Sequence, residues 1–106
     1  MSTGRYTCGG HFGSLGFEEI DAQTYAEWGV DFLSMLLPSV HLLLSQNSCP
    51  PSEYDNCYNE GQSGTPQISH DRYAKMSNAL LATGRPIVYA MCNWGEDGPW
   101  NFASVR

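Results

Sequence analysis

Two short stretches of this chain carry side chains that could take part in chemistry. Asp55 lies in the run Tyr54-Asp55-Asn56-Cys57, which is typical of the end of a buried strand that passes into a polar loop with glycine. Cys92-Asn93-Trp94 follows an apolar segment, Ile87–Met91. In α/β sheets, ligands bind where parallel strands end and the next loops begin. We therefore expect both stretches to face one site.

The residue types at these strand ends could take part in catalysis or bind a polar ligand. A retaining glycosidase needs one carboxylate as a nucleophile and a second carboxyl group as the acid, and Asp55 fits the first role. Asn93 can hydrogen-bond a hydroxyl group, and Trp94 can offer a flat apolar face. Plainer explanations stay open, because Asp55 can also cap its own loop and Trp94 can be a packing residue.

The four cysteines indicate an oxidised protein rather than a metal site. Cys8, Cys49, Cys57 and Cys92 allow three full pairings, and their spacing alone does not choose among them. They contain no Cys-x-x-Cys pair and have no histidine pair nearby, so we expect no metal. Disulfides are typical of secreted proteins, so an extracellular location is expected, although Met1–Gly10 is polar and carries no secretion signal.

Charge and hydropathy exclude two classes of partner. The net charge is −6, with 5 Lys and Arg against 11 Asp and Glu, which argues against nucleic acid binding. The apolar run Met35–Leu44 contains a proline and is too short to span a bilayer, which takes about 20 residues. We therefore expect no nucleic acid partner and no membrane insertion.

A helix and a strand should precede the first stretch. Gly29 marks a helix end, Val30–Leu33 has the apolar character of a strand, and Asp21 can cap the helix at its start. The apolar stripe of this helix recurs at helical spacing and comprises Phe17, Ile20, Thr24, Tyr25 and Trp28.

A second helix and strand should separate the two stretches. The helix is expected to begin at Ser69 and end at Thr83-Gly84, and Pro86–Met91 has the composition of a buried strand in a parallel sheet. The inward side of this helix is predicted to be Tyr73, Met76, Ala79 and Leu80, with Arg72 and Lys75 facing outward. The pattern is two consecutive αβ units in one α/β domain.

Taken together, these segments resemble the catalytic barrel of the family 27 glycoside hydrolases, the α-galactosidases, and most closely the fungal secreted members. The matching segments are Thr7–Leu33, Tyr54–Trp94 and, less specifically, Gly95–Phe102. The resemblance implies a (β/α)8 TIM barrel, which takes about 250 residues, so residues 1–106 would be a fragment of one. It also implies hydrolysis of terminal α-linked galactose in oligosaccharides or galactomannan, with no metal or organic cofactor.

The resemblance implies a role for each candidate residue. Asp55 would be the nucleophile that forms a glycosyl-aspartate intermediate. Cys8 and Cys57 would form a disulfide beside the sugar pocket, and Cys92 would be left free because its family partner is downstream. The galactose subsite would be lined by Cys8, Cys57, Cys92, Asn93 and Trp94. The acid/base aspartate would lie beyond Arg106, so neither Glu96 nor Asp97 takes that role and the chain as given should be inactive.

The segment Ser34–Glu53 departs from the family pattern. Where the relatives have a single lysine between the strand and the Tyr-Asp pair, this chain has twenty residues, and Glu53 stands in the lysine's place. A carboxylate cannot donate hydrogen bonds to a sugar as an ammonium does, and it would raise the pKa of Asp55. We interpret the segment as translated intron sequence, with an inserted hairpin or strand extension as the alternative.

Other functions fit the same residues. Within the same fold, the substrate could be an α-N-acetylgalactosaminide or a β-L-arabinopyranoside. Outside it, the chain could be a non-catalytic disulfide-bonded module or a decayed gene product, which Glu53 and the interrupted strand would favour.

Overall fold

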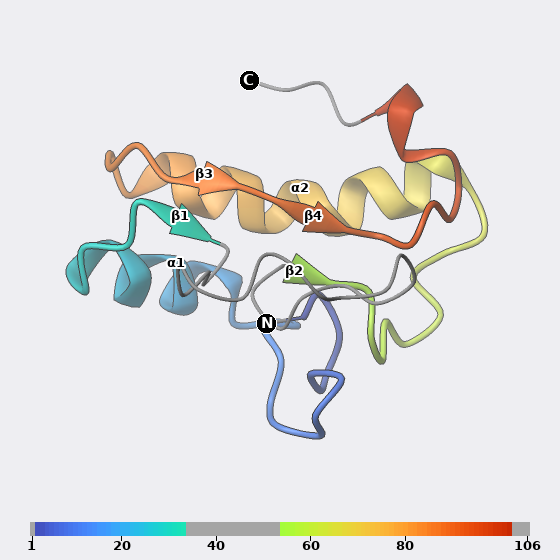
Figure 1. Cartoon of the computed structure of the whole chain (residues 1–106), viewed down its shortest axis with the longest axis horizontal. Helices are drawn as coiled ribbons and strands as arrows, with labels where there is room; N and C mark the ends of the chain where they lie inside the picture. The colour runs from blue at the N-terminus through green and yellow to red at the C-terminus, as the bar shows by residue number, and fades with distance from the viewer. Residues whose placement is uncertain (1, 34–53, 103–106) are drawn as a thin grey trace, which may run out of the picture.

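Helices alternate with short parallel strands along the chain. The computed structural model describes residues 2–33 and 54–102. Its elements are α1 (Glu18–Glu27), β1 (Phe32–Leu33), β2 (Tyr54–Asp55), α2 (Pro66–Ala82), β3 (Val88–Tyr89), β4 (Met91–Cys92) and the 3-10 helix η1 (Pro99–Asn101), as Figure 1 shows. The predicted α/β class and the two successive αβ units are confirmed.

The strand pairs lie in one line along the chain segment 88–92. β1 pairs in parallel with β3, with Phe32 opposite Val88, and β2 pairs in parallel with β4, with Asp55 opposite Cys92. Only Ala90 separates β3 from β4, and Figure 1 shows β1 and β2 on the same side of that line. β1 and β2 therefore occupy the positions of two halves of one strand.

The pairing registers show how many extra residues lie between β1 and β2. Partners are 56 positions apart in the first pair (88 minus 32) and 37 apart in the second (91 minus 54), a difference of 19. Residues 34–53 are twenty residues at a place where the ladder, through Ala90, has room for one. The segment itself lies outside the described residues, so its interpretation as intron sequence or an insertion stays a hypothesis.

α1 ends where the glycine predicted but begins earlier than expected. The Gly29 amide donates to the Ala26 carbonyl at 3.1 Å and the Val30 amide to the Tyr25 carbonyl at 3.0 Å, a Schellman motif with Gly29 at φ 74°. The N-cap is Phe17, so the prediction of Asp21 as the cap is wrong. Asp21 lies instead in the first turn, where a carboxylate interacts favourably with the helix dipole.

α2 also begins earlier than predicted. Thr65 is the N-cap, its hydroxyl accepts from the Ile68 amide at 3.2 Å, and Pro66 follows at the first helical position. The prediction of Ser69 as the cap is therefore wrong, and Ser69 is fully buried inside the helix. Arg72 was predicted to face outward, but only 3% of it is exposed, because it lies against the loop that precedes the helix.

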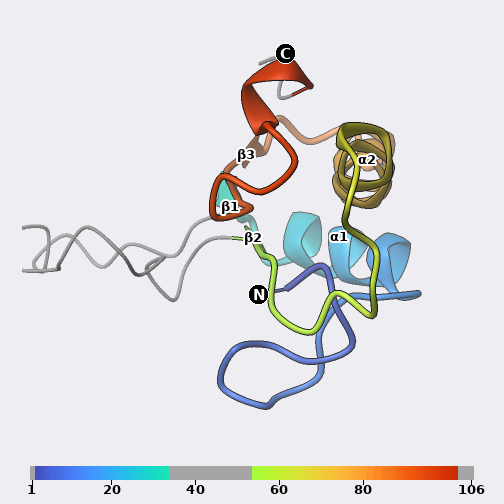
Figure 2. The same ribbon diagram turned by 90° about the vertical axis from the view of Figure 1, so that its right-hand side faces the viewer.

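The core lies between the two helices and the strands. Figure 2 shows α1 and α2 on one side of the strands, and the two helices pack against each other. The buried apolar cluster contains Ala22, Tyr25, Leu33, Tyr73, Met76, Ala79 and Leu80. The predicted inward side of α2 is thus confirmed in full.

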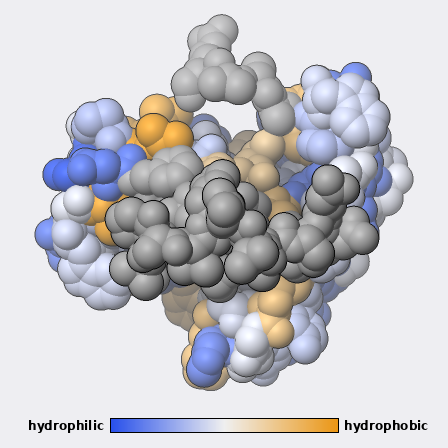
Figure 3. Space-filling model, in the orientation of Figure 1, coloured by the Kyte–Doolittle hydropathy of each residue, from blue (hydrophilic) through white to orange (hydrophobic). Residues whose placement is uncertain are grey.

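Two predictions of burial are wrong for the described residues. Of the three largest other members of the α1 stripe, Phe17 is 59% exposed, Ile20 65% and Trp28 74%, because α1 packs along one side only. In the predicted buried strand, Val88 is 61% exposed, since the helices cover a single face of the strands. Figure 3 shows apolar surface near the position that β3 has in Figure 1. Neither described helix could cross a bilayer.

Candidate active site

The structure brings the two predicted stretches together at the level of the backbone. Asp55, the last residue of β2, is the register partner of Cys92, the last residue of β4. The strands are parallel, so the loops that begin at Asn56 and Asn93 leave the same edge. The predicted juxtaposition of Asp55 with Asn93 and Trp94 therefore follows from the pairing.

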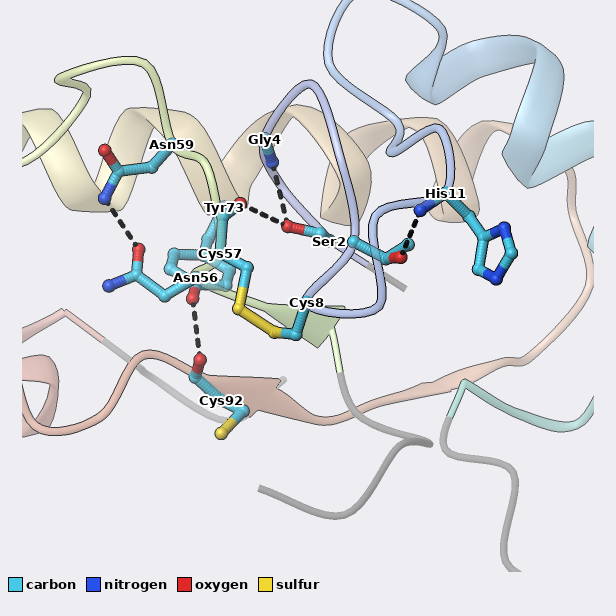
Figure 4. Close-up of a disulfide and its surroundings, with 10 residues drawn as sticks. Ser2, Gly4, Cys8, His11, Asn56, Cys57, Asn59, Tyr73 and Cys92 are labelled. Carbon is cyan, nitrogen blue, oxygen red and sulfur yellow. Dashed lines mark hydrogen bonds between the residues drawn. A yellow bond between two sulfur atoms is a disulfide. The ribbon is translucent and has the colours of Figure 1, made fainter. Parts of the chain in front are cut away.

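A disulfide fastens the N-terminal segment to the loop after β2. Cys8 and Cys57 are joined, with 5.3 Å between their Cα atoms, so this predicted pair is present (Figure 4). The Ser2 hydroxyl donates to the Cys57 carbonyl at 2.6 Å, and the Arg5 amide to the Tyr58 carbonyl at 3.1 Å. The cross-link spans 49 positions, for which the chain-entropy estimate is roughly 4 kcal/mol.

A glycine is required where this segment crosses the loop. A Cβ atom on Gly4 would lie 2.0 Å from the Tyr58 carbonyl oxygen, so no side chain fits there. The N-terminal segment therefore lies against the backbone of Cys57 and Tyr58, which follow Asp55 by two and three residues.

Cys92 corrects one prediction. It is disulfide-bonded, so the expectation of a free thiol is wrong, and its partner lies outside the described residues. The error arose because the resemblance offers no partner for this cysteine within the chain. Cys92 is 7% exposed, and its carbonyl accepts a hydrogen bond from the Tyr73 hydroxyl at 3.1 Å, which ties the end of β4 to α2 (Figure 4).

Asn93 is buried and only partly satisfied. Its Nδ2 donates to the Glu96 carbonyl at 2.8 Å, while its Oδ1 has no hydrogen-bond partner among the described residues. A buried acceptor without a donor costs about 1–3 kcal/mol. This oxygen is therefore a group that a hydroxyl donor would satisfy.

Trp94 stands in an unusual backbone conformation. Its φ is 58°, in the left-handed region that non-glycine residues rarely adopt, and 54% of the residue is exposed. The described non-glycine residues with such a φ all lie in the two loops that leave the strand ends, namely Tyr58, Glu60, Trp94 and Asp97. Backbone strain of this kind costs roughly 1–3 kcal/mol per residue and clusters at functional sites.

Asn56 connects the two loops directly after Asp55. It is 1% exposed, its Nδ2 donates to Glu96 Oε2 at 2.8 Å, and its Oδ1 accepts from Asn59 Nδ2 at 3.2 Å. The sequence reasoning missed this residue. Its only signal was its place between a candidate nucleophile and a disulfide cysteine.

Asp97 makes a second connection between the loops. Its Oδ2 accepts from Ser69 Oγ at 2.5 Å and from the Gly64 amide at 2.9 Å. The hydrogen bond from Ser69, followed by that from Gly64, holds the pKa of Asp97 below its usual range; partial burial opposes this, and the charge of Arg72 supports it.

Arg72 is a buried cation beneath the same loops. Its guanidinium lies 4.9 Å from the centre of the Tyr73 ring, and its Nη1 donates to the Gln62 carbonyl. Its Nε and Nη2 have no hydrogen-bond partner among the described residues. Asp97 is a carboxylate within electrostatic reach of this charge.

Two further expectations concern a metal ion and Glu53. Within residues 2–33 and 54–102, no three His, Cys, Asp or Glu side chains are grouped to hold a metal ion. Glu53 lies outside the described residues, so its effect on the site stays a prediction.

Comparison with known proteins identifies a consistent set of relatives. The family model described as "Alpha galactosidase A" matches residues 1–42. The α-galactosidase mel1 of Schizosaccharomyces pombe is 50% identical over 104 residues, which cover 98% of this chain and 20% of that protein. α-Galactosidase 1 of Saccharomyces cerevisiae is 51% identical over 96 residues, which cover 91% of this chain and 16% of that protein.

Solved structures agree with the sequence matches. α-Galactosidase I of Mortierella vinacea matches with a TM-score of 0.78 and 56% identity, over 97% of this chain and 21% of that one. An α-galactosidase of Saccharomyces cerevisiae solved with raffinose matches with a TM-score of 0.78 and 47% identity, over 97% and 19%. The chain thus spans about a fifth of the length of the relatives it matches.

Proposed function

The chain belongs to the α-galactosidase family over the part it spans, and on this premise we propose that it supplies the nucleophile side of a retaining α-galactosidase site. The substrate would be terminal α-linked galactose in oligosaccharides or galactomannan, and the protein would be secreted. The proposed fold of the complete enzyme is a (β/α)8 barrel, to which these residues contribute two αβ units. No cofactor is needed.

The observation that carries the proposal is the pairing of Asp55 with Cys92. It puts the backbone of the candidate nucleophile beside the loop of Asn93 and Trp94, at the carboxyl ends of two parallel strands. This is the position at which barrel enzymes carry their catalytic groups. The sequence identity of about 50% to α-galactosidases supports the same assignment.

The proposed reaction is a double displacement. The Asp55 carboxylate attacks C1 of galactose, the bond from C1 to the leaving oxygen breaks, and a second carboxyl group protonates that oxygen. Water then hydrolyses the glycosyl ester on Asp55, and the second group, now a base, takes its proton. The two carboxyl groups must be about 5–5.5 Å apart, and the second one is proposed to lie outside this chain.

The neighbouring residues would bind and position the sugar. The unsatisfied Oδ1 of Asn93 is suited to accept from a galactose hydroxyl, and the exposed Trp94 indole to cover the apolar face of the ring. The Cys8–Cys57 disulfide and the disulfide-bonded Cys92 would hold the loop bases on either side of the pocket.

A mechanism-based label tests the nucleophile. A complete form of the enzyme that contains these residues is treated with 2-deoxy-2-fluoro-α-galactosyl fluoride, digested and analysed by mass spectrometry. The label is expected on the peptide that contains Asp55, and Asp55→Asn should lower kcat by on the order of a thousandfold or more. Asp71→Asn, at an exposed position on α2, serves as the control. Label on another carboxylate would refute the proposal, and a panel of nitrophenyl glycosides would separate α-galactose from α-N-acetylgalactosamine and β-L-arabinopyranose.

A further inference from the structure

Two consecutive carboxylates after Trp94 fasten its loop in two directions. Glu96 Oε2 accepts from Asn56 Nδ2 at 2.8 Å, which links the loop to the residue after Asp55. Asp97 Oδ2 accepts from Ser69 Oγ at 2.5 Å and from the Gly64 amide at 2.9 Å, which links it to α2 and the loop before it. The Trp94 loop is thus held from both ends of the segment that joins β2 to α2.

The place that Asp97 occupies is built for an anion. Gly64 and the N-cap Thr65 immediately precede the 17-residue helix α2, and Ser69 lies in its first turns. A carboxylate at a helix N-terminus meets unpaired N–H groups and the positive end of the helix dipole. Arg72, buried and one turn further along, adds a full positive charge. The Asp97 carboxylate is therefore the anion that the Gly64 amide, the Ser69 hydroxyl and the charge of Arg72 stabilise.

The loop needs such an anchor because its backbone is strained. Trp94 has φ 58° and Asp97 has φ 55°, and conformations of this kind persist only when surrounding contacts enforce them. Inside the loop, two hydrogen bonds join Asn93 and Glu96, through the Glu96 amide at 3.1 Å and the Asn93 side chain at 2.8 Å. Those bonds close a turn but do not fix the turn relative to β2.

We propose that Asp97 is a positioning residue, which holds the loop of Asn93 and Trp94 against α2 so that the loop faces Asp55. The inference rests on the proposed function for its meaning, because the loop matters to catalysis only if it contacts the sugar. Asp97 touches neither substrate nor reacting atoms in this role. It acts through the position of Trp94.

The test combines an isosteric variant with its hydrogen-bond partner. Asp97→Asn keeps the shape of the side chain but loses the charge and one acceptor oxygen, and Ser69→Ala removes the donor. The matched control is Asp71→Asn, on the same helix with an exposed carboxylate that accepts from Gln67 at 2.6 Å. The full chain is labelled with ¹⁵N, and with 5-fluorotryptophan for ¹⁹F spectra.

The loop signals decide the inference. In Asp97→Asn the Gly64 amide should exchange about tenfold faster or more, and the ¹⁹F resonance of Trp94 should shift or broaden. The double variant with Ser69→Ala should cost less than the sum of the two single changes, because both changes remove the Ser69–Asp97 bond. Asp71→Asn should leave both signals in place. Unchanged Gly64 and Trp94 signals in Asp97→Asn would overturn the proposal.

Substrate kinetics in a complete enzyme separate this role from general destabilisation. A displaced Trp94 loop lowers the fraction of binding-competent enzyme, so KM for an α-galactoside should rise about tenfold in Asp97→Asn while kcat changes less. If the loop signals respond but the wild-type enzyme does not bind galactosides, the proposed function fails and the anchoring role stands. If galactosides bind and Asp97→Asn leaves both loop signals and KM unchanged, the function stands and the inference fails.

Discussion

Shortening the chain between β1 and β2 to one residue should stabilise the fold. The register leaves room for a single residue opposite Ala90, and residues 34–53 number twenty. Deleting residues 35–53 keeps Ser34 as that residue and joins Leu33 to Tyr54 through it. We expect β1 and β2 to become one continuous strand along residues 88–92.

The expected gain follows from loop closure. Closing a loop of n residues costs about (3/2)RT ln n, so removing a twenty-residue closure should stabilise the folded state by roughly 2.5 kcal/mol. For a domain of this size, 1 kcal/mol moves the midpoint of thermal unfolding by about 4–8 °C, so the shift should be about 10–20 °C. Because Cys92 is disulfide-bonded and the deletion removes Cys49 from the sequence, the deleted and parent chains are compared with Cys92→Ala in both.

Linker length provides a matched control. Variants with zero or two residues in place of residue 34 have the same composition elsewhere but cannot keep both pairings in register. A slip of one residue turns every side chain of the slipped half to the opposite face. Leu33, which is 3% exposed, would then leave the core, at a cost of roughly 1.5–3 kcal/mol.

Urea denaturation followed by far-UV circular dichroism measures the result. The one-residue variant should have the highest midpoint of the series, with an unchanged m-value. Equal midpoints for zero, one and two residues would show that the two strand pairs are not parts of one ladder. A one-residue variant less stable than the parent would show that residues 34–53 contribute to the folded state.

Two further predictions concern the disulfide and a buried phenol. Replacing Cys8 and Cys57 together with alanine should lower the free energy of unfolding by roughly 4 kcal/mol, as measured in urea; a loss below about 1 kcal/mol would contradict the chain-entropy reasoning. Burial, together with the charge of Asp21, raises the pKa of Tyr25 to about 12. Because the folded-state pKa is above the ordinary value of about 10, the stabilisation is fully present below pH 10 and is lost as the pH rises towards 12. Absorbance at 295 nm should show this phenol ionising near pH 12, and Tyr25→Phe should remove that step.

Local signals in the sequence predicted the helices and strands but not the contacts between them. The end of α1 at Gly29 and the buried side of α2 depend on residues within one or two turns, which periodicity and glycine placement report directly. The start of α2 was missed because Ser69 and Thr65 are both capping residues, and Pro66 was the signal that distinguishes them.

The contacts that shape the candidate site could not be predicted from neighbouring residues in the sequence. The Ser69–Asp97 bond joins positions 28 apart, and the Asn56–Glu96 bond positions 40 apart, so neither leaves a trace in the spacing of the residues. Arg72 looked like an outward cation on a helix, but its burial depends on the loop that crosses it. Asp55 and Asn93 were predicted together because strand ends in parallel sheets share an edge, a rule that needs only the order of elements.

The described pairings of β1 and β2 are all with residues 88–92. During synthesis, β1 and β2 emerge from the ribosome before residues 88–92, with which they pair. Phe32 and its partner Val88 are 56 positions apart. Contacts between residues so distant in sequence form late and slow folding. A nascent chain that ends before Met91 therefore lacks the strand with which Asp55 pairs, and a stall in translation there would leave the proposed nucleophile without a fixed position.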